Sequence, residues 1–406
     1  MGYWKEKWLE EQGRVYSTPD NSFVCSGCVI DDHLAKALVA EAEDHACSYC
    51  GASQATDMTV LLDEIADAIS AYYSDPAEEL PYESREGGYQ GTLYDGNDLV
   101  YELDDWTKND QLLEDTAGAF QNSVWTNRNY FAQNPYEALS FGWRGFSEQV
   151  KHHTRFLFLQ ELEEDGDPND IPPGRMLDAL GKLFHDFHMV AEVPIGTEFS
   201  RARVVKVGER PSSAKDLGTA PREQVVRPNR MSPAGIPMFY AAIDDDTAVL
   251  ETYQPARGGD CEIALARFRT LRPLRVLDLT QPPQMPSVFD QANREKRRPI
   301  VFLREFEREF TRPVARDDKA HVEYVPTQVV TEYVRHRFRT VDNQGLDGIR
   351  YKSSHPNAST AVVLFADPEH CGPRPDRAPF DPAPFLELTA VRYAKPAEFE
   401  NIWKDA

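Results

Sequence analysis

Apolar side chains recur at helical spacing along much of the first 190 residues. One amphipathic helix is predicted from about Thr59 to Tyr73, with Asp57 or Thr59 as its N-terminal cap. Its apolar face consists of Leu61, Ile65, Ile69 and Tyr72. Further helices are predicted around residues 110–119, 135–141, 145–159 and 175–190. An acidic stretch with Pro and Gly, residues 163–174, is predicted to be an exposed linker. The first half is therefore predicted to be mainly helical.

The pattern changes from Ile195 onward, where β-branched and aromatic residues predict a strand over 197–207. A polar loop over 208–233 follows. Shorter strands are predicted at 237–242, 276–279 and 361–365, and helices at 246–253 and 326–338. Short strands with intervening helices favour an α+β fold for the second half.

The two halves differ sharply in charge. Residues 1–190 hold 36 Asp and Glu against 12 Lys and Arg, whereas residues 191–406 hold 31 against 32. Binding a polyanion relies on Lys and Arg that neutralise phosphates, so we expect no nucleic-acid partner for the first half. Its acidity instead suits solubility or docking on a basic partner.

Nothing in the sequence predicts a membrane protein, since no run of about 18 apolar residues occurs. The first residues, MGYWKEKWLEEQG, are charged and lack the apolar core of a secretory signal. We therefore expect a cytoplasmic protein.

Four of the six cysteines form two CxxC pairs, Cys25 with Cys28 and Cys47 with Cys50. In a reducing compartment such pairs are typical of metal ligands rather than disulfides. Four thiolates complete the tetrahedral coordination of Zn²⁺ and leave no open position for water, so we predict a structural zinc site. His33 and His45 lie inside the same stretch and are expected to be surface residues.

Several segments of the second half resemble the RES family, which is named for an Arg, a Glu and a Ser. EFSRARV at 198–204 is similar to its opening strand, NRMSPAGIPMFYAAIDDDTAVLET at 229–252 to its Arg turn, strand and Glu helix, and GIRYKSS at 348–354 to its Ser segment. One departure is Pro-Asn-Arg-Met at 228–231, where the family often has Gly-Gly-Arg-Trp.

The resemblance implies an ADP-ribosyltransferase-like α+β fold that consumes NAD⁺. It assigns catalytic roles to Glu251, Arg201 and Ser353, and NAD⁺ binding to Arg201, Arg230, Tyr240 and Ser353. Two register choices stay open, between Arg201 and Arg203 and between Ser353 and Ser354.

These residue types suit the chemistry. An Arg can bind the NAD⁺ diphosphate with two parallel hydrogen bonds. An aromatic ring can stack on nicotinamide or adenine. Cleavage of the glycosidic bond passes through an oxocarbenium-like state, which a nearby carboxylate stabilises.

The first half resembles the HEPN-like amino-terminal domain that accompanies some RES proteins and begins with a double CxxC. HEPN ribonucleases place a His four to six residues after an Arg. Here Arg144 precedes His152 with seven residues between them, so no nuclease activity is expected. Three segments are predicted: a zinc unit at 1–56, a helical HEPN-like domain at 57–190 and a RES domain at 191–406.

The function implied is a toxin-like enzyme that depletes NAD⁺ by hydrolysis or phosphorolysis and is held in check by an antitoxin protein. Two alternatives stay open. One is an ADP-ribosyltransferase that modifies a protein target, and the other is a non-catalytic interaction protein stabilised by zinc.

Overall fold

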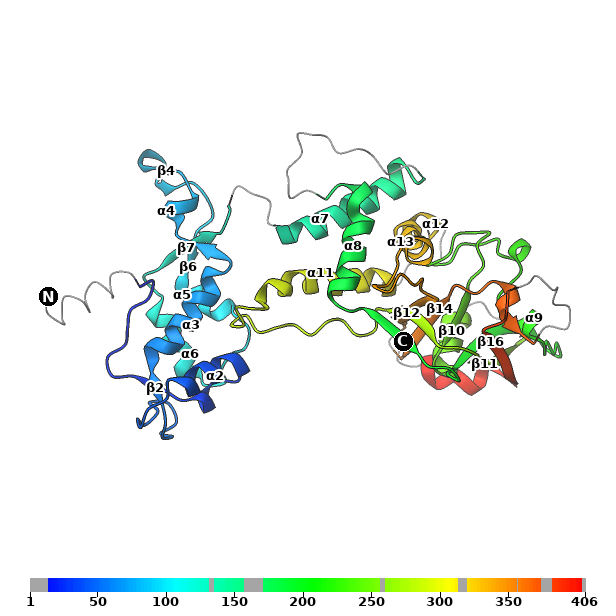
Figure 1. Cartoon of the computed structure of the whole chain (residues 1–406), viewed down its shortest axis with the longest axis horizontal. Coiled ribbons are helices and arrows are strands. Elements are labelled where there is room, and N and C mark those ends of the chain that lie inside the picture. The colour runs from blue at the N-terminus through cyan, green and yellow to red at the C-terminus, as the bar shows by residue number, and fades with distance from the viewer. Residues whose placement is uncertain are drawn as a thin grey trace. The chain divides into compact units, whose positions relative to one another are not determined.

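The structure is a computed structural model of the chain, and it describes residues 14–130, 135–156, 171–255, 260–312, 320–355, 357–373 and 382–403. The chain folds as two compact units (Figure 1). Unit 1 comprises Met1–Glu137 and Gln284–Ile300, and unit 2 comprises Ala138–Pro283 and Val301–Ala406. The boundaries of the two units differ from the predicted domain boundaries at residues 56 and 190. The division into three segments, 1–56, 57–190 and 191–406, therefore stays a prediction.

Unit 1 packs helices and short strands around one apolar core. Helix α3, Met58–Ser70, lies at its centre, because Leu61, Leu62 and Ile65 are fully buried on one face. Asp57 caps this helix by accepting a hydrogen bond from the Thr59 amide, as the sequence predicted. The predicted end at Tyr73 was three residues too late, since Tyr73 belongs to a strand.

The other helices of unit 1 are α2 Asp32–Ala40, α4 Pro76–Glu79, α5 Gly96–Glu102 and α6 Asp110–Ala119. Its strands are β1 Phe23–Val24, β2 Thr56–Asp57, β3 Tyr73–Ser74, β4 Tyr82–Glu83, β5 Gly88–Tyr89, β6 Tyr94–Asp95 and β7 Val124–Asn127.

Unit 2 is built on a mixed sheet. Its strands are β8 Val190–Val193, β9 Glu198–Lys206, β10 Phe239–Ala242, β11 Cys261–Thr270, β12 Leu274–Asp278, β13 Gly348–Lys352, β14 Thr360–Leu364, β15 Cys371–Gly372 and β16 Leu386–Ala394. Among the described residues their order is β15-β16-β11-β9-β10-β14-β13-β12-β8. The pairs β12–β13 and β15–β16 are parallel, and the other neighbours are antiparallel.

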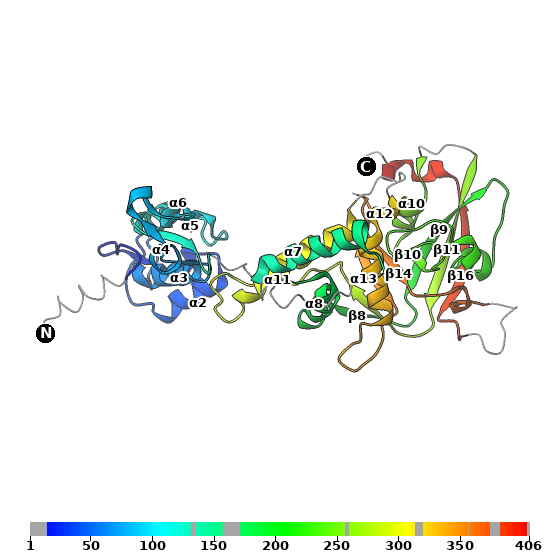
Figure 2. The same ribbon diagram turned by 90° about the horizontal axis from the view of Figure 1, so that it is seen from above.

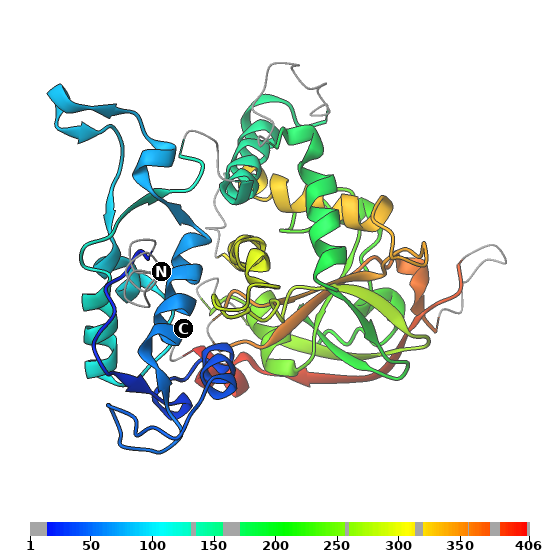
Figure 3. The ribbon, with the colours of Figure 1, turned by 60° about the vertical axis from the view of Figure 1, so that its left-hand side comes forward.

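The sheet curves over a shared inner core (Figure 3). Phe268 of β11 and Val276 of β12 belong to the same buried cluster, although their strands are not neighbours in the sheet. Side chains alternate between the two faces of a strand, so each strand also presents residues to the outer face. Helices cover that outer face in two clusters.

The helices of unit 2 are α7 Pro135–Glu148, α8 Pro173–Asp186, α9 Ala214–Leu217, α10 Asp245–Thr252, α11 Arg297–Thr311, α12 Ala320–Glu323 and α13 Val325–His336; α7 and α11 begin among residues of unit 1. Helix α10 packs with β9 and β11. The longer helices α7, α8, α11 and α13 form a second layer (Figure 2), whose core also takes residues from β10, β13 and β14.

The α+β class expected for this half is confirmed, and three local predictions were wrong. Two separate helices were predicted at 135–141 and 145–159, but one helix, α7, runs through the first segment and into the second, as far as Glu148. Gly142 lies between the two segments, where it packs closely and does not interrupt the helix. A Cβ at Gly142 would lie 2.9 Å from Ile171 Cβ. Residues 157–159 lie outside the described part. The helix predicted at 175–190 ends at Asp186, and Val190 starts β8, which pairs with β12. The loop over 208–233 contains α9, which begins with a Ser213–Asp216 capping box.

None of the helices in the described ranges combines the length and the apolar character needed to span a bilayer.

We predict that Phe306→Ala destabilises unit 2 by about 3–5 kcal/mol, because the ring is buried and its loss leaves a cavity. Phe306 is 1% exposed, and its ring lies 5.1 Å from that of Trp143 in α7. Denaturant unfolding followed by tryptophan fluorescence measures the loss. Val301→Ala in the same helix is the control, since Val301 is 46% exposed and its truncation should change stability by less than about 0.5 kcal/mol. Equal losses in the two variants would show that the α11 core position is wrong.

Candidate functional site

The four CxxC cysteines converge in unit 1. Their Sγ atoms all lie within 4.8 Å of one another. Individual separations are 3.8 Å for Cys25–Cys28, 3.4 Å for Cys25–Cys50 and 3.7 Å for Cys28–Cys47. A tetrahedral ion with metal–sulfur bonds of about 2.3 Å requires sulfur–sulfur edges of about 3.8 Å. The donor set therefore fits a four-thiolate metal site.

Local backbone structure prepares one thiol of this cluster for metal binding. Burial acts to raise the pKa of Cys47, but backbone N–H groups of Tyr49 and Cys50 point at its sulfur and lower that pKa to about 7. A thiol must lose its proton to bind a metal, so this lowering favours ligation at Cys47, whereas burial raises the pKa of Cys25 and of Cys28 and acts against ligation there.

Neither histidine of the stretch belongs to the cysteine group. His45 stacks on Phe23 with ring centroids 4.2 Å apart, and its Nε2 lies 3.3 Å from Glu43 Oε2. His33 Nε2 lies 3.4 Å from Asp290 Oδ2.

In unit 2, Glu251 and Ser353 meet. Glu251 sits near the end of α10, and Ser353 follows β13 directly. The Ser353 hydroxyl donates a hydrogen bond of 2.5 Å to Glu251 Oε1. Of the two serines left open by the sequence, Ser353 is the one that contacts the glutamate.

Further hydrogen bonds fix the start of α10 and join it to this loop. Asp244 caps the helix by accepting from the Thr247 amide and hydroxyl. The Ser359 amide then donates to Thr247 Oγ1 at 2.8 Å, which ties the loop after β13 to the first turn of α10. The orientation of Glu251 therefore depends on contacts at both ends of a short helix.

Two tyrosines of the sheet lie near enough to Glu251 for its charge to act on them. Tyr240 on β10 and Tyr351 on β13 flank β14, where Val363 and Ala361 are their respective partners. Burial raises the pKa of both hydroxyls, and the nearby negative charge of Glu251 raises them further. Both tyrosines are neutral near pH 7, as a tyrosine with its ordinary pKa also is, and the shift raises the pH at which either could ionise. The Tyr240 hydroxyl also forms a 2.8 Å hydrogen bond with Ser232.

Tyr351 was not among the predicted site residues. Its sequence signal is its place in GIRYKSS, two positions before Ser353. Side chains two apart on an extended segment share a face, so that spacing could have identified it.

Arg230 lies at the turn before β10 and is held by main-chain carbonyls. Its guanidinium donates to the Glu309 carbonyl at 3.3 Å and to the Arg312 carbonyl at 2.6 Å, at the C-terminal end of α11. A cation is favoured there because the last carbonyls of a helix carry partial negative charge. The Arg230 charge is also close enough to act on Tyr351, whose pKa it lowers against the effect of burial.

Helix α13 fixes the turn that carries Arg230. Thr327 donates its hydroxyl to the Arg230 carbonyl at 2.6 Å. The buried Gln328 amide donates to the carbonyls of Asn229 at 2.8 Å and Ser232 at 3.3 Å. The departure from Gly-Gly-Arg-Trp at this turn is thus accommodated by side-chain bonds from α13.

Arg201 has a different setting. Its neighbours Ser200 and Ala202 face α10, whereas Arg201 projects to the inner face, where its guanidinium lies 5.1 Å from the Phe239 ring. Nε donates to the Leu217 carbonyl at 3.0 Å and Nη1 to the Tyr240 carbonyl. Burial lowers the pKa of Arg201 to about 10, so the group stays charged.

Strands β9 and β10 pair at a single position, where Ala242 lies opposite Ser200. Arg201 follows Ser200 directly, and its side chain adds a second link between the two strands through the Tyr240 carbonyl. Arg203 is exposed and donates to the Asp216 carbonyl. Of the two arginines, Arg201 is thus the one whose charge acts on a site tyrosine, since it lowers the pKa of Tyr240 against burial.

The arrangement offers one carboxylate with a hydroxyl bonded to it, two neutral phenols, and arginine charges nearby. The carboxylate can stabilise a developing cation, and the arginines can attract anionic groups of a ligand. This combination suits a ligand that carries anionic groups and a reaction in which positive charge develops near the carboxylate.

Two protein-family models match the chain. Residues 40–164 match HEPN/RES N-terminal domain 1, and residues 205–382 match the RES domain. The second match includes Arg230, Tyr240, Glu251 and Ser353, whereas Arg201 precedes it. No curated protein and no solved structure matches the chain.

Proposed function

Because this chain is a RES protein, with an HEPN/RES N-terminal domain before its RES domain, we propose that it binds NAD⁺ and cleaves the nicotinamide–ribose bond. The observation that carries the proposal is the Glu251 carboxylate, bonded by Ser353 and flanked by two neutral tyrosines. Cleavage would deplete NAD⁺, which is the action of a toxin. The curved sheet is the ADP-ribosyltransferase-like fold that we propose for unit 2.

The bond between ribose C1′ and the nicotinamide nitrogen breaks with its electron pair moving onto the ring. Nicotinamide leaves as a neutral molecule, so no general acid is needed. The ribose becomes oxocarbenium-like, and Glu251 stabilises that positive charge. With water as acceptor a C1′–O bond forms, water loses a proton, and ADP-ribose results. With phosphate as acceptor the product is ADP-ribose 1-phosphate.

The other residues bind and orient the dinucleotide in this proposal. Arg201 uses the N–H groups not committed to the two carbonyls to hold the diphosphate, together with Arg230. Tyr240 provides an aromatic face, and Ser353 both orients Glu251 and contacts ribose or phosphate oxygens. An antitoxin protein would act by covering these groups.

We predict that Glu251→Gln lowers nicotinamide release at saturating NAD⁺ by roughly a hundredfold, as expected when a group worth on the order of 3 kcal/mol to the transition state is lost. The amide keeps the size of the side chain and an oxygen that can accept from Ser353. NAD⁺ binding should persist. Product identification with and without phosphate, and with a protein acceptor, separates hydrolysis, phosphorolysis and ADP-ribosyl transfer.

Asp246→Asn is the matched control, because Asp246 is an exposed carboxylate of the same helix. It should retain wild-type turnover and stability. Equal turnover of Glu251→Gln and wild type would make Glu251 a structural residue. A wild-type protein that releases no nicotinamide would favour the non-catalytic reading.

For Arg201 we predict that replacement by Lys raises KM for NAD⁺ more than it lowers kcat, because a lysine keeps the charge but loses the forked donors. Arg203→Lys serves as the control, since Arg203 lies two residues further along β9, on the same face as Arg201, and is exposed. The split between KM and kcat is measured on both variants. If both show wild-type kinetics while only Arg201→Lys loses stability, Arg201 holds β9 and β10 together without binding NAD⁺.

We also propose that the cysteine cluster holds one structural Zn²⁺ through Cys25, Cys28, Cys47 and Cys50. Elemental analysis should find one zinc per chain in the wild type and less in Cys25→Ser. Because metal binding contributes folding free energy, that variant should lose stability in unit 1. Cys261→Ser, which alters a cysteine outside the cluster, is the control and should keep its zinc. Wild-type protein without zinc would refute the assignment.

A further inference from the structure

A segment of the RES domain folds with the other unit. Residues Gln284–Ile300 lie within the RES match at 205–382, yet they belong to unit 1. They follow β12 and contain the first four residues of α11. We call this segment the strap.

The strap is anchored by two apolar side chains. Val288 and Phe289 are each 4% exposed and are members of the unit 1 core, the same cluster as Leu61 and Ile65 of α3. Side chains buried to this extent in the core of another sequence domain are part of its packing, not loop residues resting on a surface.

Charge complements this packing. Arg294 donates to Asp67 of α3, with Nη1 2.5 Å from Oδ2, and only 17% of its side chain is exposed. Arg297 Nη2 lies 2.7 Å from Asp104 Oδ2. The Arg298 guanidinium lies 4.4 Å from the centre of the Tyr72 ring. The acidic first half therefore has a basic partner within its own chain.

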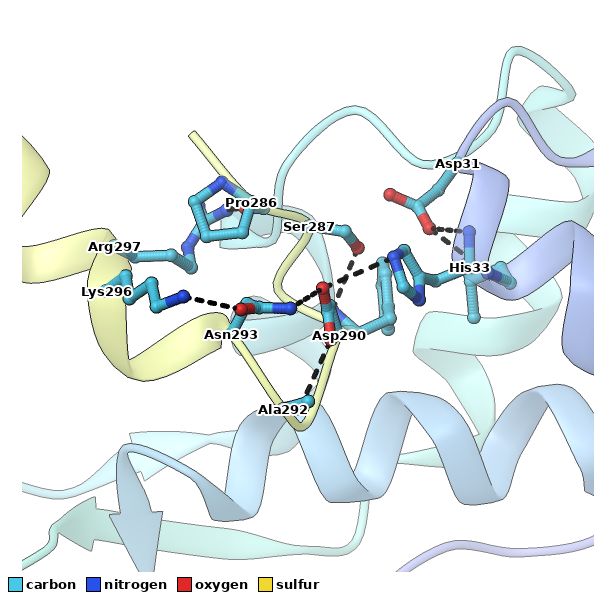
Figure 4. A network of polar contacts seen from close by, with 11 residues as sticks. Asp31, His33, Pro286, Ser287, Asp290, Ala292, Asn293, Lys296 and Arg297 are labelled. Carbon is cyan, nitrogen blue, oxygen red and sulfur yellow. Dashed lines mark hydrogen bonds and ion pairs between the residues drawn. The ribbon is translucent and has the colours of Figure 1, made fainter. Parts of the chain in front are cut away.

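A turn around Asp290 gives the strap its shape (Figure 4). The Asp290 carboxylate accepts from the Ala292 amide at 3.2 Å and from Asn293 Nδ2 at 2.8 Å. The same carboxylate faces His33 of α2. The strap is thus folded on itself as well as bound to two helices of unit 1.

The far end of α11 lies at the candidate site. Its last turn supplies the Glu309 carbonyl that Arg230 binds, and the following residue supplies the Arg312 carbonyl. One helix therefore has its first turn held by Asp104 and Tyr72 and its last turn held by Arg230.

We propose that the strap is a docking element through which the acidic N-terminal unit fixes helix α11 and, at its other end, the position of Arg230. Docking stands on the contacts of the strap alone. Its effect on NAD⁺ rests on the function proposed above, in which Arg230 binds the diphosphate.

The test compares Arg294→Glu with Lys296→Glu in the full-length protein. Both reverse one positive charge of the strap, but Lys296 is exposed and its amine donates to Asn293 of the strap itself, at 2.8 Å. Combining Asp67→Arg with Arg294→Glu reverses the ion pair and should restore most of the wild-type hydrogen exchange and KM. Amide hydrogen exchange is measured over 287–294 and over 307–312, and KM and kcat are measured for NAD⁺.

For Arg294→Glu we expect exchange over 287–294 to become about tenfold faster, as loss of one charged hydrogen bond implies. Exchange over 307–312 should also rise, and KM should increase about fivefold while kcat stays near wild type. Lys296→Glu should resemble the wild type, and the charge-reversed pair should recover most of both effects.

Unchanged exchange over 287–294 in Arg294→Glu would overturn docking. Faster exchange there without any change over 307–312 would overturn the coupling through α11. If the wild type does not cleave NAD⁺, the proposed function fails, and the two exchange measurements still decide both parts of this proposal.

Discussion

The hydrogen bond from Ser353 to Glu251 joins two positions that are 102 residues apart, one on α10 and one beyond β13. A carboxylate near the end of a short helix has rotational freedom unless something outside the helix holds it. The serine removes that freedom, and the Ser359–Thr247 bond fixes the same loop at the start of the helix. The geometry of the candidate site depends on this double attachment.

The sheet determines which groups surround that carboxylate. Tyr240 pairs with Val363 of β14, and Tyr351 pairs with Ala361 of the same strand. Because Val363 and Ala361 are two positions apart, both tyrosines point to the same face of the sheet, the outer one. Both phenols are neutral near pH 7, as tyrosines ordinarily are, so the groups near the carboxylate are dipoles and not competing anions. Arg201 projects to the inner face of β9 and donates to the Tyr240 carbonyl, close to the one position at which β9 and β10 pair. A shift of one residue in either strand would exchange these roles.

Elements with a strong local signal could be predicted from the sequence. Helix α6 has the predicted bounds, and the cap of α3 was foreseen, because both depend on residues within a few positions of one another. The convergence of the four cysteines follows from CxxC spacing in the same way. Strand β11 was missed, since a central strand with both faces buried lacks the alternation that marks a half-exposed strand. The spacing of Tyr351 from Ser353 places both on one face, but the approach of Tyr351 to Glu251 arises only in the folded sheet.

The limits of compact units follow burial, whereas family matches follow sequence order. Phe289 falls inside the RES match, but no local pattern indicates that its ring belongs to the core around α3. The sequence does show an acidic first half suited to a basic partner, and Arg294 and Arg297 belong to such a partner. Removing the strap from the core of unit 1 is costly, since it would expose the buried side chains of Val288 and Phe289 and break the ion pairs of Arg294 and Arg297. In our proposal the N-terminal unit is therefore a part of the mechanism that positions Arg230.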